Sequence, residues 1–195
     1  MHLNTNSGIT IEEQNILLGL AHHAIVNGIQ HGQTIPIDLS DFDEELCVPR
    51  ATFVTLHLNN ELRGCIGSLE AYRALVKDVV HNAYAAAFSD PRFPPVREDE
   101  VDQLDIHISI LNPSEEMHFS SEQDLINQLR PEIDGLIISE GHLRGTFLPS
   151  VWESLKEPHA FLQHLKLKAG LPADYWSDSI EVMRYTTTSF PGKNS

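Results

Sequence analysis

Glu61-Leu62-Arg63-Gly64-Cys65-Ile66-Gly67 decides the fold, because it follows an apolar and β-branched run, Thr52-Phe-Val-Thr-Leu-His-Leu58, after only two asparagines. Asparagine tolerates a positive φ, so Asn59-Asn60 predicts a tight turn that joins two strands in a β-hairpin. Side chains alternate across an extended segment, which places Arg63 and Cys65 on one face. A hairpin of this kind favours an antiparallel sheet over a doubly wound parallel one.

Cys65 is the candidate catalytic residue of this stretch. A guanidinium beside a thiol favours the thiolate, and Gly64 and Gly67 allow another backbone or a ligand to come close. His57 on the preceding strand and His107 on another expected strand are candidate proton acceptors, because alternation puts both on polar faces. The alternative is a buried cysteine with a structural role, since free cysteine is among the most buried residue types.

Patterns along the rest of the chain predict a mixture of helices and strands. Thr10-Ile-Glu-Glu13 is a capping box before apolar residues at helical spacing, so a helix is expected to end at Gly28 or Gly32. An apolar stripe predicts a helix up to Ser89-Asp90-Pro91, where the proline stops it. The remaining expectations are an acidic loop at 33–50, helices at 121–129, 150–156 and 158–169, and strands at 104–111, 135–139, 143–148 and 179–187.

The tripeptide Leu-Arg-Gly occurs twice, at 62–64 and 143–145, each time in the return strand of an expected hairpin that a helix follows. This echo indicates either an internal duplication or a coincidence. If the copies are equivalent, Arg63 and Arg144 take matching positions and flank one cleft, which Thr146 helps to line. The planar guanidinium suits carboxylate or phosphate, so this cleft is expected to bind an anion. The alternative for both arginines is an internal salt bridge in an acidic chain.

Four segments, in order, resemble the AMMECR family. The first is LRGCIG itself, and the others are Ser89-Asp-Pro-Arg-Phe-Pro-Pro95, Leu104-Asp-Ile-His-Ile-Ser-Ile-Leu111 and Gly145-Thr-Phe-Leu-Pro-Ser-Val-Trp152. The resemblance covers roughly residues 10 to 190 and identifies the chain as similar to the stand-alone, bacterial-type members. The family more often has an acidic residue at the place of His107, so no carboxylate role is carried over to that position.

The resemblance implies an α+β fold of antiparallel sheets with packed helices. It is expected to form a single AMMECR-like domain over 10–190, either undivided or made of two interleaved subdomains, with flexible tails at 1–9 and 191–195. In the second segment, Arg92 and Phe93 are candidate cleft-wall residues; a rigid turn that closes the preceding helix is the alternative. Bacterial relatives are often encoded beside, or fused to, a Memo-like and a radical-SAM protein, which implies partners of these two kinds.

Composition limits the classes of function. The 195 residues carry 28 acidic and 13 basic side chains, a formal net charge of −15 that disfavours nucleic acid as a partner. No apolar run reaches the ~18 residues of a membrane helix, so no membrane association is expected. Two cysteines and the lack of a signal-peptide pattern at the start predict a cytoplasmic protein.

Neither a cofactor nor a resident metal is expected from the motifs. The 11 histidines lack ligand spacing, and no CxxC pair or HExxH occurs, although a site made from Cys65, His57 and His107 is geometrically conceivable across strands.

The sequence leaves two hypotheses about function. The chain is either an enzyme that uses Cys65 on a small anionic or carbonyl-bearing substrate, or a non-catalytic module that presents the LRGCIG cleft to a partner protein.

Overall fold

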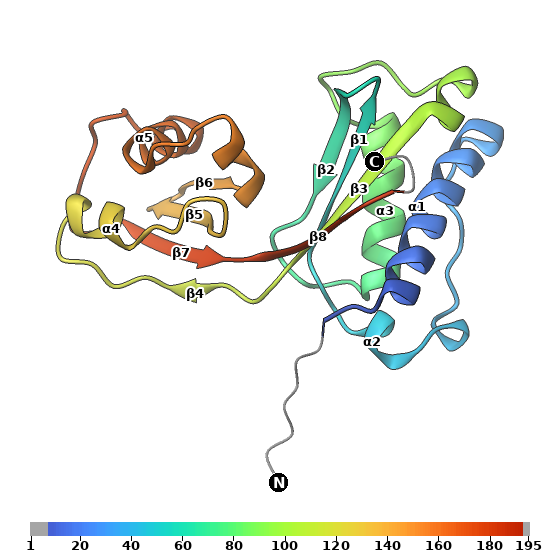
Figure 1. Cartoon of the computed structure of the whole chain (residues 1–195), viewed down its shortest axis with the longest axis horizontal. Helices are drawn as coiled ribbons and strands as arrows, with labels where there is room; N and C mark the ends of the chain where they lie inside the picture. Colours follow the sequence, from blue (N-terminus) through green and yellow to red (C-terminus); the bar gives the residue numbers. More distant parts are fainter. Residues whose placement is uncertain (1–7, 193–195) are drawn as a thin grey trace, which may run out of the picture. The chain divides into compact units, whose positions relative to one another are not determined.

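The structure, a computed structural model, describes residues 8–192 and divides into two compact units (Figure 1). Unit 1 contains the chain up to Leu111 together with the segment from Thr188, and unit 2 is the continuous stretch Asn112–Thr187. The expected tails fall mostly outside the described residues. At the carboxyl side, however, Gly192 donates a backbone hydrogen bond to the carbonyl of Ile106 (2.7 Å), so it belongs to unit 1.

Unit 1 is a four-stranded sheet with helices on one face. Its strand order is β2-β1-β3-β8, in which β1 pairs antiparallel with both β2 and β3. Two long helices pack together and cover one side of this sheet, as Figure 1 shows. The elements of unit 1 are α1 (Ile11–His31), η1 (Leu39–Asp41), α2 (Glu44–Cys47), β1 (Thr52–Leu58), β2 (Glu61–Gly67), α3 (Leu75–Phe88), η2 (Glu98–Gln103), β3 (Leu104–Leu111) and β8 (Thr187–Pro191).

Local signals in the sequence set the ends of these elements. Thr10 and Glu13 form the expected capping box at the start of α1, and Gly32, with φ of 67°, ends the helix in the left-handed conformation. Asn59 and Asn60 have φ of 53° and 64°, as the hairpin turn requires. The segment expected to be an acidic loop at 33–50 contains the short helices η1 and α2.

Unit 2 repeats the plan with its own sheet and core. Its strand order is β4-β7-β5-β6, with antiparallel pairing throughout. Trp152 and Phe161 stack at the centre of its core, with ring centroids 3.8 Å apart. The elements of unit 2 are β4 (Glu115–Glu116), α4 (Glu122–Gln128), β5 (Gly135–Glu140), β6 (Leu143–Phe147), η3 (Pro149–Glu153), α5 (Pro158–Ala169) and β7 (Glu181–Tyr185).

The expected α+β class with antiparallel sheets is therefore confirmed, but one expected strand is wrong. The segment 179–187 is not a single strand: β7 ends at Tyr185 and β8 begins at Thr187, and the two belong to different sheets. In the same way, the chain leaves β3 of unit 1 and enters β4 of unit 2. Each sheet therefore takes its fourth strand from chain that continues out of the third strand of the other sheet.

The two sheets match strand for strand. Read from the hairpin outward, the orders are β2-β1-β3-β8 and β6-β5-β7-β4, so hairpin, third strand and continuing fourth strand recur in both units. This extends the Leu-Arg-Gly echo from a tripeptide to a whole sheet.

Within residues 8–192, no helix has the length and apolar character that a membrane span requires.

A glycine in each hairpin packs directly on the following helix. A Cβ on Gly64 would lie 2.2 Å from the carbonyl oxygen of Ala86 in α3, and one on Gly145 would lie 2.9 Å from the backbone nitrogen of Ala169 in α5. Both glycines are buried. The close approach expected at Gly64 is therefore made by the protein's own helix, which leaves no room there for a ligand.

Candidate functional site

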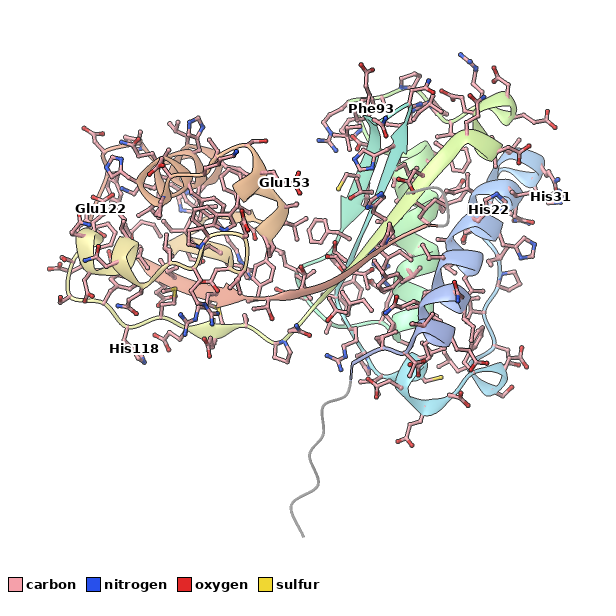
Figure 2. All side chains as sticks on the ribbon, viewed as in Figure 1. His22, His31, Phe93, His118, Glu122 and Glu153 are labelled. Atoms are coloured by element: carbon pink, nitrogen blue, oxygen red, sulfur yellow. The ribbon has the colours of Figure 1, made fainter. Side chains whose placement is uncertain are left out.

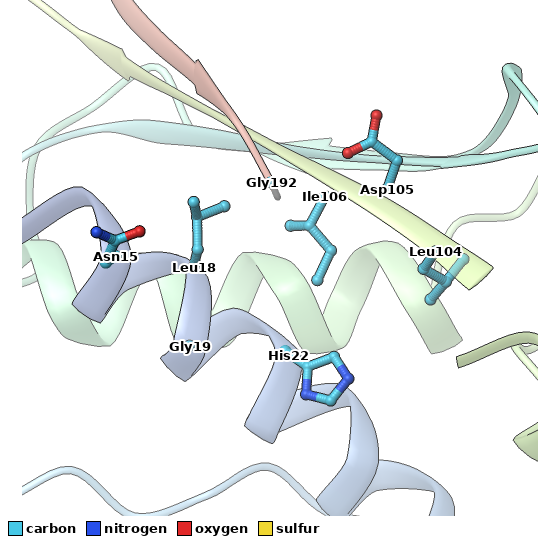
Figure 3. A pocket seen from close by; sticks show the side chains of 8 residues that line it. All are labelled: Asn15, Leu18, Gly19, His22, Leu104, Asp105, Ile106 and Gly192. Atoms are coloured by element: carbon cyan, nitrogen blue, oxygen red, sulfur yellow. The ribbon is translucent and has the colours of Figure 1, made fainter. Parts of the chain in front are cut away.

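Three candidate residues of unit 1, namely Cys65, His57 and His107, lie on the outer face, by which we mean the face of the β2-β1-β3-β8 sheet turned away from α1 and α3. Alternation produces this face: Figure 3 shows Leu104 and Ile106 pointing toward α1 and Asp105 pointing to the opposite side. Strand register then aligns Cys65, Thr55 and His107 in one row across β2, β1 and β3. The fold thus brings together three polar groups that lie up to 52 residues apart in the sequence.

Cys65 lies in a polar setting on this face. Its Sγ is 3.3 Å from Oγ1 of Thr55, and its side chain is half-buried. Its backbone N–H donates to Oδ2 of Asp90 (2.9 Å), and its carbonyl accepts from Nη2 of Arg92 (3.2 Å). Cys47, the second cysteine, is also a free thiol, so neither sulfur is consumed in a disulfide.

Arg92 is the cation beside Cys65. Its Nε and Nη2 donate to the two oxygens of Asp90 (3.0 and 2.7 Å), and its side chain remains about half exposed. Asp90 raises the pKa of Arg92 most strongly, and the nearby Cys65 sulfur raises it further. In return, hydrogen bonds from Arg92, outweighing burial, hold the pKa of Asp90 far below its usual range. The loop expected to form either a turn or a cleft wall thus carries a charged group to the thiol.

Arg63 does not share the face of Cys65, contrary to the sequence expectation. A β-bulge interrupts the ladder, because Leu56 pairs with Gly64 whereas the next residue pairs with Leu62. The Arg63 guanidinium instead donates to both oxygens of Glu100 (3.0 and 2.9 Å) and to the carbonyls of Pro94 and Pro95, and only 11% of its side chain is exposed. The internal salt bridge, given as the alternative, is what the chain forms.

Arg144 and Thr146 belong to unit 2. Arg144 is exposed and pairs regularly with Ser139, so it does not occupy a bulge as Arg63 does. Thr146 donates to the carbonyl of Leu136 (2.8 Å) and lies 3.1 Å from the hydroxyl of Tyr185, whose pKa burial raises to about 12. The cleft shared by Arg63 and Arg144 stays a prediction, because the two residues are in different units.

His57 and His107 come together with a residue that sequence reasoning missed, Asp105. Nε2 of His107 lies 2.7 Å from Oδ2 of Asp105, and the two imidazole rings meet edge to face with centroids 5.0 Å apart. The three side chains, named here the His–Asp–His cluster, each offer one ligand atom within 4.8 Å of the others. The signal for Asp105 was its place two residues before His107 on the same strand face.

Two other candidate residues have structural contacts. A Cβ on Gly67 would meet the ring of Phe53 at 2.3 Å, so this glycine makes room for that ring on the outer face. Phe93 follows Arg92 in the loop beside β2 (Figure 2), and the Arg92 guanidinium lies 5.4 Å from its ring centroid. Phe93 is therefore positioned to hold the loop that carries Arg92.

A separate hollow of about 380 Å³ lies between α1 and the edge of β3 (Figure 3). Its volume is in the range of small-molecule pockets, and its lining is mainly apolar, with Asn15 and His22 as polar groups from α1. The lining includes Asp105 but none of Cys65, Thr55 or Arg92. The thiol and the guanidinium of the outer face therefore lie outside this hollow.

The fold and the outer face define a class: α+β proteins with two matched antiparallel sheets, one of which presents a thiol, a guanidinium and a histidine–carboxylate group. The AMMECR1 family model matches residues 18–190, and the chain belongs to this family. The expected resemblance is thereby confirmed.

Relatives from archaea and bacteria extend over nearly the whole chain. A Thermotoga maritima protein is 40% identical over 173 residues, covering 87% of this chain and 94% of its own length. Protein MK0488 of Methanopyrus kandleri is 35% identical over 176 residues, covering 86% and 82%. The crystal structure of the uncharacterized protein PH0010 from Pyrococcus horikoshii is similar with a TM-score of 0.88 at 33% identity, covering 95% of this chain and 94% of that one.

Proposed function

We propose that the outer face of unit 1 carries out cysteine-dependent chemistry on a small anionic substrate that bears a carbonyl group. The observation that carries this proposal is the position of Cys65, whose sulfur contacts the Thr55 hydroxyl and whose carbonyl accepts a hydrogen bond from the Arg92 guanidinium. A neighbouring cation favours the nucleophilic thiolate over the thiol. The reducing cytoplasm, where we place the protein, keeps this sulfur available.

Each group has a defined role in the proposed step. Arg92 binds the carboxylate or phosphate of the substrate, because its side chain is about half exposed and its charge lies beside the sulfur. The Cys65 sulfur forms a bond to the carbonyl carbon, and the π electron pair of the carbonyl moves to oxygen. The thiol proton passes to the Thr55 hydroxyl, which lies 3.3 Å from the sulfur and stands between Cys65 and His107 in the row of strands, and from there to His107. The carbonyl oxygen takes up one proton in return, so the adduct forms without another reactant.

The competing proposal is a non-catalytic surface that binds a partner protein, of the Memo-like or radical-SAM kind. Leu62 favours it, because this apolar side chain is 41% exposed in the strand that carries Cys65. The two proposals differ in what they require of the thiol. A catalytic Cys65 reacts in the folded protein, whereas a docking surface has no such requirement.

Alkylation of the folded protein distinguishes them. With iodoacetamide near neutral pH, we expect Cys65 to be labelled well before Cys47, whose thiol donates to the carbonyls of Leu39 and Phe42. The order is read by peptide mass mapping, and Cys65→Ser removes the fast phase. We expect Arg92→Gln to slow labelling of Cys65 several-fold, because the charge beside the sulfur is lost.

Arg97→Gln is the matched control, since Arg97 forms the same arginine–aspartate pair two residues apart, with Asp99, at an exposed position. It removes an equal charge and is expected to leave the labelling rate unchanged. Labelling of Cys65 only after urea is added would exclude the catalytic proposal and favour the docking surface. Equal slowing by both arginine variants would remove Arg92 from the site.

A further inference from the structure

We infer that the His–Asp–His cluster is a binding site for a divalent transition-metal ion such as Zn²⁺ or Co²⁺. His57, Asp105 and His107 are half-buried, and each has one ligand atom within 4.8 Å of the other two. Two imidazoles and one carboxylate are a donor set that zinc uses where a coordination position stays open for water or substrate. This cluster does not include Cys65, so the inference rests on its own geometry.

The distances suit a small tetrahedral ion. Metal–ligand bonds near 2.0–2.1 Å place tetrahedral ligand atoms about 3.3 Å apart. The separations in the cluster run on both sides of this value, from 2.7 Å between His107 and Asp105 up to 4.8 Å at most. Side-chain rotations alone can therefore bring the three atoms around one ion, without moving the strands.

The backbone holds the three residues in fixed positions. His57 pairs directly with Asp105 across β1 and β3, and His107 follows two residues later on the same face. A site on adjacent strands is more precisely held than a site on loops. The chain also carries a net charge of −15, which raises the local concentration of cations.

The matching sheet of unit 2 lacks this donor set. Aligning the two sheets by register, Ser139 takes the place of His57, Glu181 that of Asp105 and Met183 that of His107. No imidazole stands at these positions, so one ion per chain is expected. If the ion is present during the proposed thiol chemistry, hydroxide bound to it would serve as the proton acceptor, because zinc lowers the pKa of bound water to about 7.

Titration of tag-free full-length protein with Co²⁺ tests the inference. We expect one ion per chain and the visible absorption of Co²⁺ in a low-symmetry nitrogen and oxygen site, which Zn²⁺ then displaces. His57→Asn, Asp105→Asn and His107→Asn should each weaken binding by about tenfold or more, since loss of even outer-shell partners costs that much. The control is His22→Asn with His23→Asn, which removes two exposed adjacent histidines of α1 and should leave binding unchanged.

Thermal unfolding with and without Zn²⁺ distinguishes loss of the metal site from poor folding of a variant. Zn²⁺ should raise the thermal midpoint of the parent chain and of the α1 control, but not that of Asp105→Asn. Binding that survives all three cluster variants, or that disappears in the α1 control, would overturn the site. Cys65→Ser should bind Co²⁺ as the parent does, so failure of the metal site and failure of the proposed thiol chemistry are seen separately.

Discussion

Gly64→Ala is expected to lower the free energy of unfolding by about 3 kcal/mol or more, or to prevent folding altogether. The new Cβ would lie 2.2 Å from the carbonyl oxygen of Ala86, and a backbone oxygen in a helix cannot rotate away. The helix must then separate from β2, which opens the core of unit 1. Urea unfolding at neutral pH, followed by circular dichroism, measures the loss.

Gly19→Ala provides the matched control. Gly19 lies on the exposed side of α1, and a Cβ there would meet nothing within 4 Å. Because alanine is the better helix former, this change should stabilise the protein by about 0.5–1 kcal/mol. A Gly64→Ala protein as stable as the parent would show that the contact between helix and strand is loose.

Asp90→Ala has the second largest expected effect, a loss of about 3 kcal/mol at neutral pH. Asp90 is only 5% exposed and accepts hydrogen bonds from the backbone of Cys65 and from Arg92. Its removal leaves the half-buried backbone N–H of Cys65 without this acceptor and frees the loop that carries Arg92. Urea unfolding measures the loss, and the position of Arg92 is read from the rate of Cys65 labelling.

The loss of unfolding free energy in Asp90→Ala should depend on pH in a defined direction. In the unfolded chain the pKa of Asp90 is about 3.9, and in the folded protein it is lower. The charge of Asp90 therefore stabilises the fold fully above the unfolded pKa, and this stabilisation is lost as the pH decreases through the folded pKa. The gap between parent and Asp90→Ala should therefore narrow below about pH 4. Asp99→Ala, at the exposed arginine pair, is the control and should leave stability unchanged. A gap that stays constant down to low pH would contradict the role given to the charge of Asp90.

Local signals were enough to predict most of the elements. The capping box at Thr10 and the asparagine turn between β1 and β2 act within a few residues, and both form as expected. The break at Thr186 carried no such signal, because residues on both sides of it favour strands. What divides β7 from β8 is the choice of sheet, which depends on partners far away in the sequence.

The candidate site was also predictable only in part, because some of its residues are placed by local strand alternation and others by partners far away in the sequence. Alternation correctly put His57 and His107 on a polar face, since it needs only a regular strand. It failed for Arg63, because the bulge beside Gly64 breaks the two-residue period. The cation beside the thiol is Arg92, 27 residues further on, and only the folded loop brings it there.

The position of β8 after all of unit 2 in the sequence sets an order of events during synthesis. Unit 2 receives all four of its strands from one continuous stretch, whereas the sheet that carries Cys65 waits for Thr187–Pro191. On the ribosome, the half made first is thus completed last, the reverse of the usual N-terminal-first order. Until those residues emerge, β3 keeps a bare edge, the kind of surface at which nascent chains aggregate.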